Sequence, residues 1–195
     1  MAADPIIFFG LWLQKPLHIA AANPSGRRLA DAIAHCVELA RPGPVLELGA
    51  GTGSLTRGLI KRGCPPERII AVEREPRLTA VLHREFPGAT VIEADATRIG
   101  EHLAGRLERL STVISSLPLK WFPLAAQSAI VRPCFDLLGP DGRFLQVTNG
   151  FSSPLPMDRL GITGREIRRI WLNMLPAQIW SYSLAIGPLD GRVRL

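Results

Sequence analysis

Short apolar runs alternate with amphipathic stretches over residues 45–148, and this alternation limits the chain to few folds. We expect five strands, at residues 45–48, 68–73, 90–94, 112–116 and 143–148. The helices between them are expected at residues 54–61, 76–85, 99–109 and 123–138. Strands that alternate with helices of this length form a parallel sheet, because each helix crosses one face and returns the chain to the same edge. The sequence therefore predicts an α/β fold with helices on both faces of the sheet.

One further helix is expected before this alternation, over residues 27–40. Ser25 is a candidate N-cap for it. Its inward face is predicted from apolar residues at helical spacing, which are Leu29, Ile33, Val37 and Ala40.

The alternation stops after Asn149, where two apolar and aromatic stretches follow at residues 165–175 and 178–184. A helix is possible for the first stretch, but its Ile and Trp residues favour a strand. We expect an antiparallel hairpin that closes one edge of the sheet.

Residues 1–22 differ in composition from the rest and form a segment of their own, ahead of a domain over residues 23–195. The apolar and aromatic residues that give this segment helical spacing and a wide apolar surface are Ile6, Phe8, Phe9, Trp12, Leu13 and Leu17. Such a helix must either pack on the protein's own core or lie in a membrane interface, where Trp and Phe are favoured. No run reaches the roughly 18 apolar residues of a membrane span. Asp4 and the polar pair at 14–15 argue against a signal peptide, so we expect a cytoplasmic chain.

The charge balance indicates an acidic partner. Lys and Arg number 23 against 17 Asp and Glu, which gives a net charge of +6 and a pI near 10.0. Nucleic acid, an anionic membrane and a phosphorylated substrate all fit this charge. A mean hydropathy of +0.16 tilts the choice toward a membrane. The three cysteines and four histidines have no metal-binding spacing, so no metal site is expected.

The strongest functional signal is a glycine-rich run directly after the first expected strand and before a helix. The run is Glu47-Leu48-Gly49-Ala50-Gly51-Thr52-Gly53. Glycine permits positive φ angles and close approach of a ligand, and the helix that follows offers free N–H groups. We therefore predict that Gly49, Gly51, Thr52 and Gly53 bind a nucleotide-type cofactor at the carboxyl end of the sheet.

Acidic residues at the ends of three successive strands indicate which cofactor this is. Glu73 stands 26 residues after Glu47, with Arg74 beside it, and can accept both hydroxyls of a ribose. Glu47 suits a cofactor that carries an amino group and a sulfonium charge. The third glycine of the loop falls one residue too early for a dinucleotide fingerprint, which favours S-adenosylmethionine over NAD. Asp95 and the backbone of Ala96 are placed to bind the adenine amino group.

Through ELGAGTG at residues 47–53, Glu73 in AVE and Asp95 in EADA, the chain resembles the class I methyltransferases. The resemblance implies a Rossmann-like, seven-stranded sheet whose last two strands form the terminal hairpin. It also implies that S-adenosylmethionine donates the methyl group and leaves as S-adenosylhomocysteine.

The fourth strand is followed by Ser115-Ser116-Leu117-Pro118-Leu119. Methyltransferases of this class place the reacting nitrogen beside this strand end. The resemblance therefore makes Ser115, Ser116, Leu117 and Pro118 the candidate catalytic residues, with Ser115 also near the cofactor. The rRNA adenine dimethyltransferases have Asn-Leu-Pro-Tyr here, and their aromatic residue stacks on the base. This sequence has serine and Leu119 at the asparagine and aromatic positions.

This form of the motif resembles the bacterial phospholipid N-methyltransferases, which convert phosphatidylethanolamine to phosphatidylcholine. The resemblance covers roughly residues 20–185 and extends to Pro24-Ser25, to residues 152–160 and to residues 172–180. It implies a phospholipid substrate and peripheral association with the cytoplasmic membrane, with Phe8 and Trp12 of the first segment at the bilayer.

Methyl transfer to nitrogen needs a neutral lone pair and close approach, so positioning supplies most of the rate. A desolvating pocket lowers the pKa of a primary amine, and the backbone carbonyls of residues 115–117 are candidate acceptors of its protons. A growing quaternary ammonium is attracted to aromatic faces, for which the candidates are Trp121, Phe151 and Tyr182. Candidate cations for the lipid phosphate are Lys120, Arg27, Arg28 and Arg98. Ordinary core or surface roles stay open for each of these side chains.

Two other functions are weighed against a phospholipid N-methyltransferase. An RNA adenine methyltransferase fits the basic pI, but Ser115 and Leu119 oppose it, and no helical RNA-binding domain is expected after the hairpin. Nucleic acid is therefore not an expected partner. A non-catalytic lipid-binding protein on the same scaffold is opposed by the intact glycine loop and its acidic residues.

Overall fold

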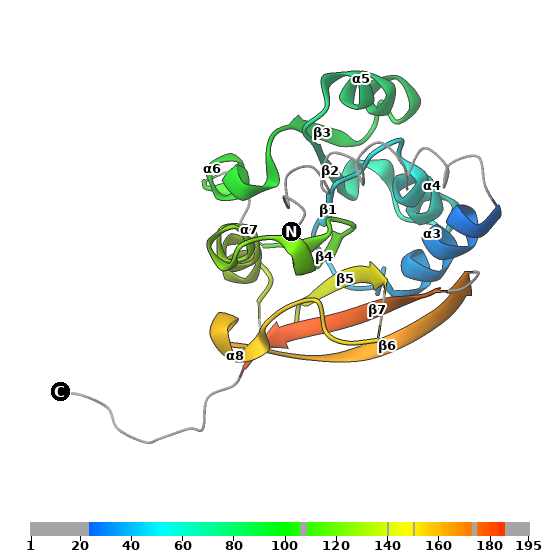
Figure 1. Cartoon of the computed structure of the whole chain (residues 1–195). Coiled ribbons are helices and arrows are strands. Elements are labelled where there is room, and N and C mark those ends of the chain that lie inside the picture. Colours follow the sequence, from blue (N-terminus) through cyan, green and yellow to red (C-terminus); the bar gives the residue numbers. More distant parts are fainter. Residues whose placement is uncertain (1–23, 106–108, 140, 150, 173–174, 186–195) are drawn as a thin grey trace, which may run out of the picture.

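The computed structural model describes residues 24–105, 109–139, 141–149, 151–172 and 175–185 (Figure 1). These residues form one seven-stranded sheet of order β3-β2-β1-β4-β5-β7-β6. The strands are β1 (Val45–Leu48), β2 (Ile69–Glu73), β3 (Thr90–Glu93), β4 (Thr112–Ser115), β5 (Arg143–Asn149), β6 (Ile162–Leu172) and β7 (Leu175–Leu184). Strands β1 to β5 are parallel, and β7 runs antiparallel to both of its neighbours. The predicted fold class is confirmed.

Helices cover both faces of the sheet (Figure 1). The α-helices are α3 (Pro24–Cys36), α4 (Ser54–Lys61), α5 (Pro76–Glu85), α6 (Ile99–Leu103), α7 (Leu124–Leu137) and α8 (Met157–Leu160). Three 3₁₀ turns join them: η1 (Pro66–Arg68), η2 (Ala96–Arg98) and η3 (Leu119–Trp121). Helices α3, α4 and α5 pack on one face of the sheet, and α6, α7 and α8 pack on the other.

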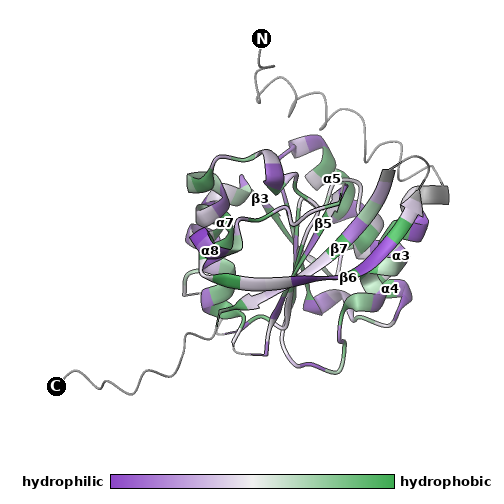
Figure 2. Cartoon of the chain, turned by 60° about the horizontal axis from the view of Figure 1, so that its bottom comes forward, coloured by the Kyte–Doolittle hydropathy of each residue, from purple (hydrophilic) through white to green (hydrophobic). Residues whose placement is uncertain are grey.

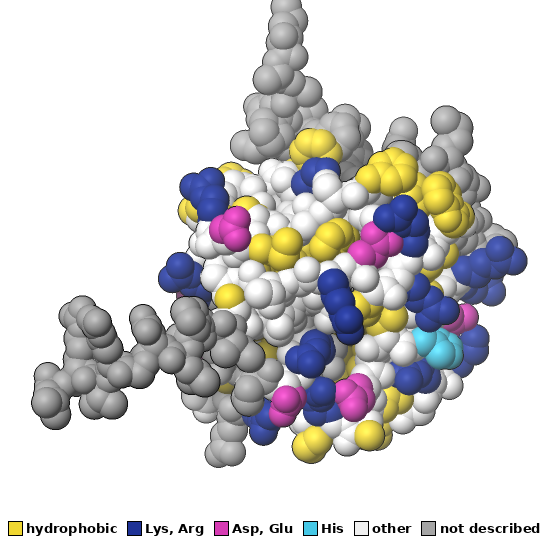
Figure 3. All heavy atoms as spheres, turned by 90° about the horizontal axis from the view of Figure 1, so that it is seen from below, with side chains coloured by type: hydrophobic (Ala, Val, Ile, Leu, Met, Phe, Trp, Pro, Cys, Tyr) yellow, Lys and Arg dark blue, Asp and Glu magenta, His cyan; other side chains and the backbone are white. Residues whose placement is uncertain are grey.

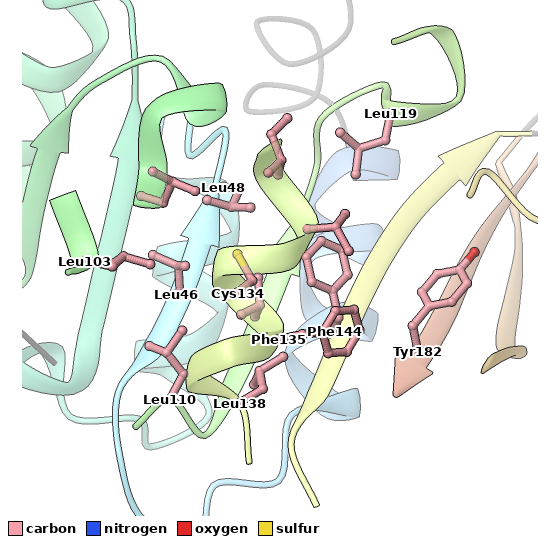
Figure 4. Close-up of a cluster of buried hydrophobic side chains, with 14 of the residues drawn as sticks. Leu46, Leu48, Leu103, Leu110, Leu119, Cys134, Phe135, Leu138, Phe144 and Tyr182 are labelled. Atoms are coloured by element: carbon pink, nitrogen blue, oxygen red, sulfur yellow. The ribbon is translucent and has the colours of Figure 1, made fainter. Parts of the chain in front are cut away.

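Side chains of the central strands point alternately to the two faces of the sheet, so each strand contributes to both layers of the core. In β1, Leu46 and Leu48 face α7, whereas Val45 faces α3 and α4. Every residue of β1, β2 and β4 is buried, as expected for parallel strands covered by helices on both sides. Figure 4 shows the larger cluster, where Phe135 of α7 stacks on Phe144 of β5 with ring centroids 5.7 Å apart. Figure 2 shows hydrophilic residues on the outward sides of the helices and along part of the edge strand β6.

Three predicted boundaries differ from the structure. Helix α3 already contains Pro24 and ends at Cys36, so Ser25 is not its N-cap and Ala40 is exposed rather than inward. Helix α6 ends at Leu103, because the backbone leaves the helical region at Ala104. The hairpin is longer than expected, and β6 rules out the helix considered for residues 165–175.

The expected segment over residues 1–22 lies outside the described residues. Within the described part of the chain, no helix is long and apolar enough to cross a membrane.

Candidate active site

The carboxyl ends of the parallel strands meet at one edge of the sheet, and the glycine loop lies there between β1 and α4. Gly49, Gly51 and Gly53 have φ angles of +78°, +57° and +75°, which favour glycine. A Cβ atom on Gly49 would lie 2.8 Å from Cδ2 of Leu117, and one on Gly53 would overlap the ring of Phe86. The loop is therefore held close to both the β4 end and α5.

Glu73 fixes the conformation of this loop from the neighbouring strand. It is 6% exposed, and its Oε2 accepts a hydrogen bond of 2.9 Å from the Gly51 N–H. Its Oε1 accepts from the N–H groups of Arg74 and Glu75 at 2.9 and 3.0 Å. A carboxylate has about four acceptor positions, so the side chain retains acceptor capacity for a ribose hydroxyl.

Glu47 lies beneath the loop, on the α4 side of β1. Its Oε2 accepts a hydrogen bond of 2.6 Å from the hydroxyl of Thr56 in α4. Burial is the main cause that raises the pKa of Glu47 to about 7; the hydrogen bonds of Thr56 oppose this shift and the charge of Glu73 adds to it. The site thus holds a buried carboxyl whose ionised form is costly until a cation lies close to it.

Asp95 stands two residues after β3, close to the end of β2. Its Oδ1 accepts from the N–H and the hydroxyl of Thr97 at 2.8 and 2.7 Å, and its Oδ2 lies 3.8 Å from the Arg74 guanidinium. Partial burial raises the pKa of Asp95, but the Thr97 hydrogen bonds and the charges of Arg74 and Arg98 outweigh it, so the net shift is downward. Ala96 follows as the first residue of η2. The predicted acidic trio therefore lies at one sheet edge.

At the end of β4, Ser115 is fully buried and its Oγ accepts from the Leu117 N–H at 3.3 Å. The Ser116 N–H donates to the Leu48 carbonyl at 3.1 Å, which ties this strand end to the start of the glycine loop. Pro118 follows with φ −79° and ψ 58°, and the Leu119 N–H donates back to the Leu117 carbonyl at 2.8 Å. This is an inverse γ-turn. It leads directly into η3, whose first residue, Leu119, is buried.

Two buried glutamines that the sequence analysis did not single out hold this segment in place. Gln146 of β5 donates from Nε2 to the carbonyl of Leu117 at 2.8 Å. Gln127 of α7 donates to the carbonyls of Leu119 and Phe122 at 2.8 and 3.1 Å. The Leu117 carbonyl thus already accepts two hydrogen bonds, so it is a poor acceptor for amine protons. The only sequence signal for the role of either residue was a single glutamine within an otherwise apolar strand or helix.

A cavity of about 490 Å³ lies between α3, α4 and α5 beside the glycine loop. Thr52 and Ser54 line it, and among the described residues the buried hydroxyl oxygen of each has no hydrogen-bond partner. Arg27, predicted near the site, lines the same cavity. These hydroxyls stand at the amino terminus of α4, where N–H groups favour an anionic group.

The remaining predicted substrate residues divide between surface and core. Lys120 and Trp121 of η3 are exposed, and the Lys120 Nζ lies 3.4 Å from the Ser152 hydroxyl. Tyr182 is fully buried, and its hydroxyl shares a hydrogen bond of 2.8 Å with Ser153. Burial raises the pKa of Tyr182 to about 12. Its predicted role at a substrate or membrane surface is therefore wrong, because its ring packs in the core. Phe8 and Trp12 lie outside the described residues.

A glycine loop after β1, acidic residues after β2 and β3, and a sheet ending in an antiparallel hairpin together define a class I methyltransferase. Residues 45–142 match the family model described as "Methyltransferase domain", and the chain belongs to this family of S-adenosylmethionine-dependent enzymes.

Relatives and solved structures agree with this family. An ornithine lipid N-methyltransferase of Singulisphaera acidiphila is 31% identical over 149 residues, covering 74% of this chain and 78% of that protein. A probable ribosomal RNA small subunit methyltransferase A of Methanosarcina mazei is 40% identical over 88 residues, but this covers 45% of the chain and 30% of that protein.

Among solved structures, a TehB-like S-adenosylmethionine-dependent methyltransferase of Corynebacterium glutamicum has a TM-score of 0.61 at 16% identity, over 93% of this chain and 100% of that one. A Burkholderia thailandensis 1,6-didemethyltoxoflavin-N1-methyltransferase with bound S-adenosylhomocysteine has a TM-score of 0.64 at 18% identity, over 94% and 92%. At these identities the likeness shows the fold.

The residues of this site fit S-adenosylmethionine. Its sulfonium suits the buried carboxylates of Glu47 and Glu73, and one ribose hydroxyl suits the remaining acceptor position of Glu73. The unpartnered hydroxyls of Thr52 and Ser54 suit a carboxylate such as the cofactor's own.

The raised pKa of Glu47 makes stability depend on pH. Between pH 4.5 and about 7 the native protein holds a proton on Glu47 that the unfolded chain releases. The free energy of unfolding of the cofactor-free protein should therefore fall by about 3 kcal/mol across this range because of Glu47. Urea denaturation at several pH values should show that Glu47→Gln removes this fall. Parallel pH profiles for the variant and the wild type would contradict the raised pKa.

Gln146 is a positioning residue for the segment after β4. Gln146→Leu should lower kcat by about tenfold or more, because a displacement near 1 Å is enough for such losses. The affinity for S-adenosylhomocysteine should stay the same, since the cofactor residues belong to other strands. Gln178→Leu, which removes a buried amide from β7, controls for reduced stability. Equal loss of cofactor affinity and kcat in Gln146→Leu would refute the positioning role.

Proposed function

We propose that the protein N-methylates the primary amine of a membrane lipid, with phosphatidylethanolamine and its mono- and dimethyl forms as acceptors toward phosphatidylcholine. The observation that carries this proposal is the segment after β4, where serine and leucine replace the polar and aromatic residues of a base-binding motif. Leu119, at the aromatic position, is fully buried and offers no stacking surface. The ornithine lipid N-methyltransferase relative supports a lipid-borne amine.

The buried strand end suits the chemistry of an amine nucleophile. When bound, the cofactor supplies an electrophilic methyl group on sulfur. The acceptor ammonium would first lose one proton to water, and its lone pair would then take the methyl group while the S–C bonding pair would stay on sulfur, so each methylation would release one proton. The enclosed segment at Ser115 and Ser116 favours the neutral amine, because desolvation lowers the pKa of an ammonium group. Since the Leu117 carbonyl already accepts two hydrogen bonds, we assign the orienting role to the Ser116 carbonyl.

The two buried glutamates favour the reactant cofactor over the product. The donor carries a positive sulfonium, whereas the sulfur of S-adenosylhomocysteine is neutral. Glu47 and Glu73 lie close enough that the charge of Glu73 raises the pKa of Glu47. A positive charge at this place relieves that repulsion, and its loss after methyl transfer weakens the attraction. Product release is thereby favoured.

Two further acceptors are favoured by specific observations. Ornithine lipid is the acceptor named for the relative that matches 74% of this chain. RNA adenine is suggested by the rRNA methyltransferase relatives and the basic pI, but the match to the Methanosarcina mazei protein spans 45% of the chain.

One assay separates these acceptors. The full chain is incubated with methyl-labelled S-adenosylmethionine and with phosphatidylethanolamine vesicles, ornithine-lipid vesicles or ribosomal RNA. We expect label in the organic extract of phosphatidylethanolamine vesicles, and much less there with Glu73→Gln at the same cofactor concentration. Label only in ornithine lipid would reassign the headgroup. Label only in RNA would refute the lipid proposal.

A further inference from the structure

Three exposed aromatic side chains lie at the edge of the sheet that carries the active site. Trp121, Phe151 and Trp171 are 60%, 64% and 66% exposed. Trp121 ends η3, which follows β4, and Phe151 stands two residues after β5. Trp171 is the penultimate residue of β6, which runs parallel to β5 because each is antiparallel to β7. All three therefore follow or end strands that point toward the same sheet edge.

Contacts join these segments into one surface. Asn149 of β5 and Ile170 of β6 both pair with Ala177 of β7, so the ends of β5 and β6 are in register. The Arg169 guanidinium lies 5.9 Å from the centroid of the Phe151 ring. Trp171 shares a face of β6 with Arg169, because residues two apart in a strand point the same way.

The surface continues to the segment after β4. The Lys120 Nζ lies 3.4 Å from the hydroxyl of Ser152, the neighbour of Phe151. This contact links η3 and its Trp121 to the loop after β5. We call the set Lys120, Trp121, Phe151, Arg169 and Trp171 the aromatic edge.

The aromatic edge contains two cations, Lys120 and Arg169, and an anionic surface attracts cations. Lys120 is exposed. Arg169 is bound to Glu166 at 2.7 Å, and Glu166 also accepts from Gln178, so this guanidinium is held in place beside Phe151. On the face seen from below, Figure 3 shows hydrophobic side chains together with Lys and Arg and with several Asp and Glu side chains.

We infer that the aromatic edge docks the methyltransferase domain on an anionic lipid bilayer. Tryptophan and phenylalanine rings are favoured at the depth of the headgroups, and cations beside them are attracted to anionic lipids. The inference rests on the proposed function and deepens it. Because Ser115 and Ser116 lie at the same sheet edge, docking here turns the segment after β4 toward the lipid amines.

Vesicle binding by the full chain tests this surface. The triple variant Trp121→Ala, Phe151→Ala, Trp171→Ala is compared with the double variant Ile167→Ala, Leu184→Ala. The control residues are 37% and 50% exposed but stand in the middle of β6 and at the opposite end of the sheet. The vesicles contain phosphatidylcholine and phosphatidylglycerol without an amine acceptor, so binding is measured apart from methylation.

We expect the affinity of the triple variant for these vesicles to fall by about tenfold or more, because three interfacial aromatic anchors are lost. The control variant should bind like the wild type, and both should bind S-adenosylhomocysteine normally, which shows that they are folded. Unchanged vesicle binding by the triple variant would overturn the inference. The inference would also be overturned if the triple variant lost binding to RNA while its binding to vesicles stayed unchanged.

Fluorescence quenching by lipids with brominated acyl chains separates this surface from the first segment. Trp12→Phe leaves three tryptophans, two of them in the aromatic edge. Quenching should persist in Trp12→Phe and disappear when Trp121→Phe and Trp171→Phe are added to it. Loss of quenching in Trp12→Phe alone would place the bilayer at the first segment and overturn the inference. If the methylation assay fails while quenching persists, the proposed acceptor is wrong and the docking surface stands.

Discussion

The hydrogen bond from the Gly51 N–H to the buried carboxylate of Glu73 is the interaction on which the site depends. It joins the end of β2 to the glycine loop after β1 and holds a backbone with three positive φ angles in one shape. The loop in turn packs against Leu117 of the segment after β4 and against Phe86, which directly follows α5. One carboxylate therefore sets the relative positions of the cofactor residues and the segment where the acceptor amine is proposed to react.

The charged side chains at this edge of the sheet are arranged as methyl transfer from a cationic donor requires. Glu47 and Glu73 are buried close together, which is unfavourable without a nearby cation, and the proposed chemistry begins with a cationic sulfur and ends with a neutral one. Glutamines rather than charged residues hold the segment after β4. Gln127 and Gln146 donate to its carbonyls from α7 and β5 without adding charge beside an amine that must lose a proton. The cations of the described surface that we assign to lipid headgroups lie farther out, on η3 and β6.

The parts of the structure that were predictable from sequence are those with strong local periodicity or backbone requirements. The β-α alternation and the glycine loop gave the parallel sheet, and the β-forming residues near Trp171 and Trp180 gave the hairpin. Contacts between residues far apart in the sequence were not predictable. The burial of Tyr182 depends on Ser153 and the register of β7, and the roles of Gln127 and Gln146 depend on contacts across α7 and β5. Nothing in the local sequence indicates that Phe151 meets Arg169, because that contact joins the loop after β5 to β6.

Isothermal titration calorimetry with S-adenosylmethionine tests the central claim most directly. The wild-type protein should bind it, and Glu73→Gln should bind it about tenfold or more weakly, because hydrogen bonds to a charged group are worth about 1.5–3 kcal/mol. Arg77→Gln, an exposed change in α5, should bind like the wild type. Equal affinities for the wild type and Glu73→Gln, or no heat with the wild type, would contradict the claim that these carboxylates and the glycine loop hold the methyl donor.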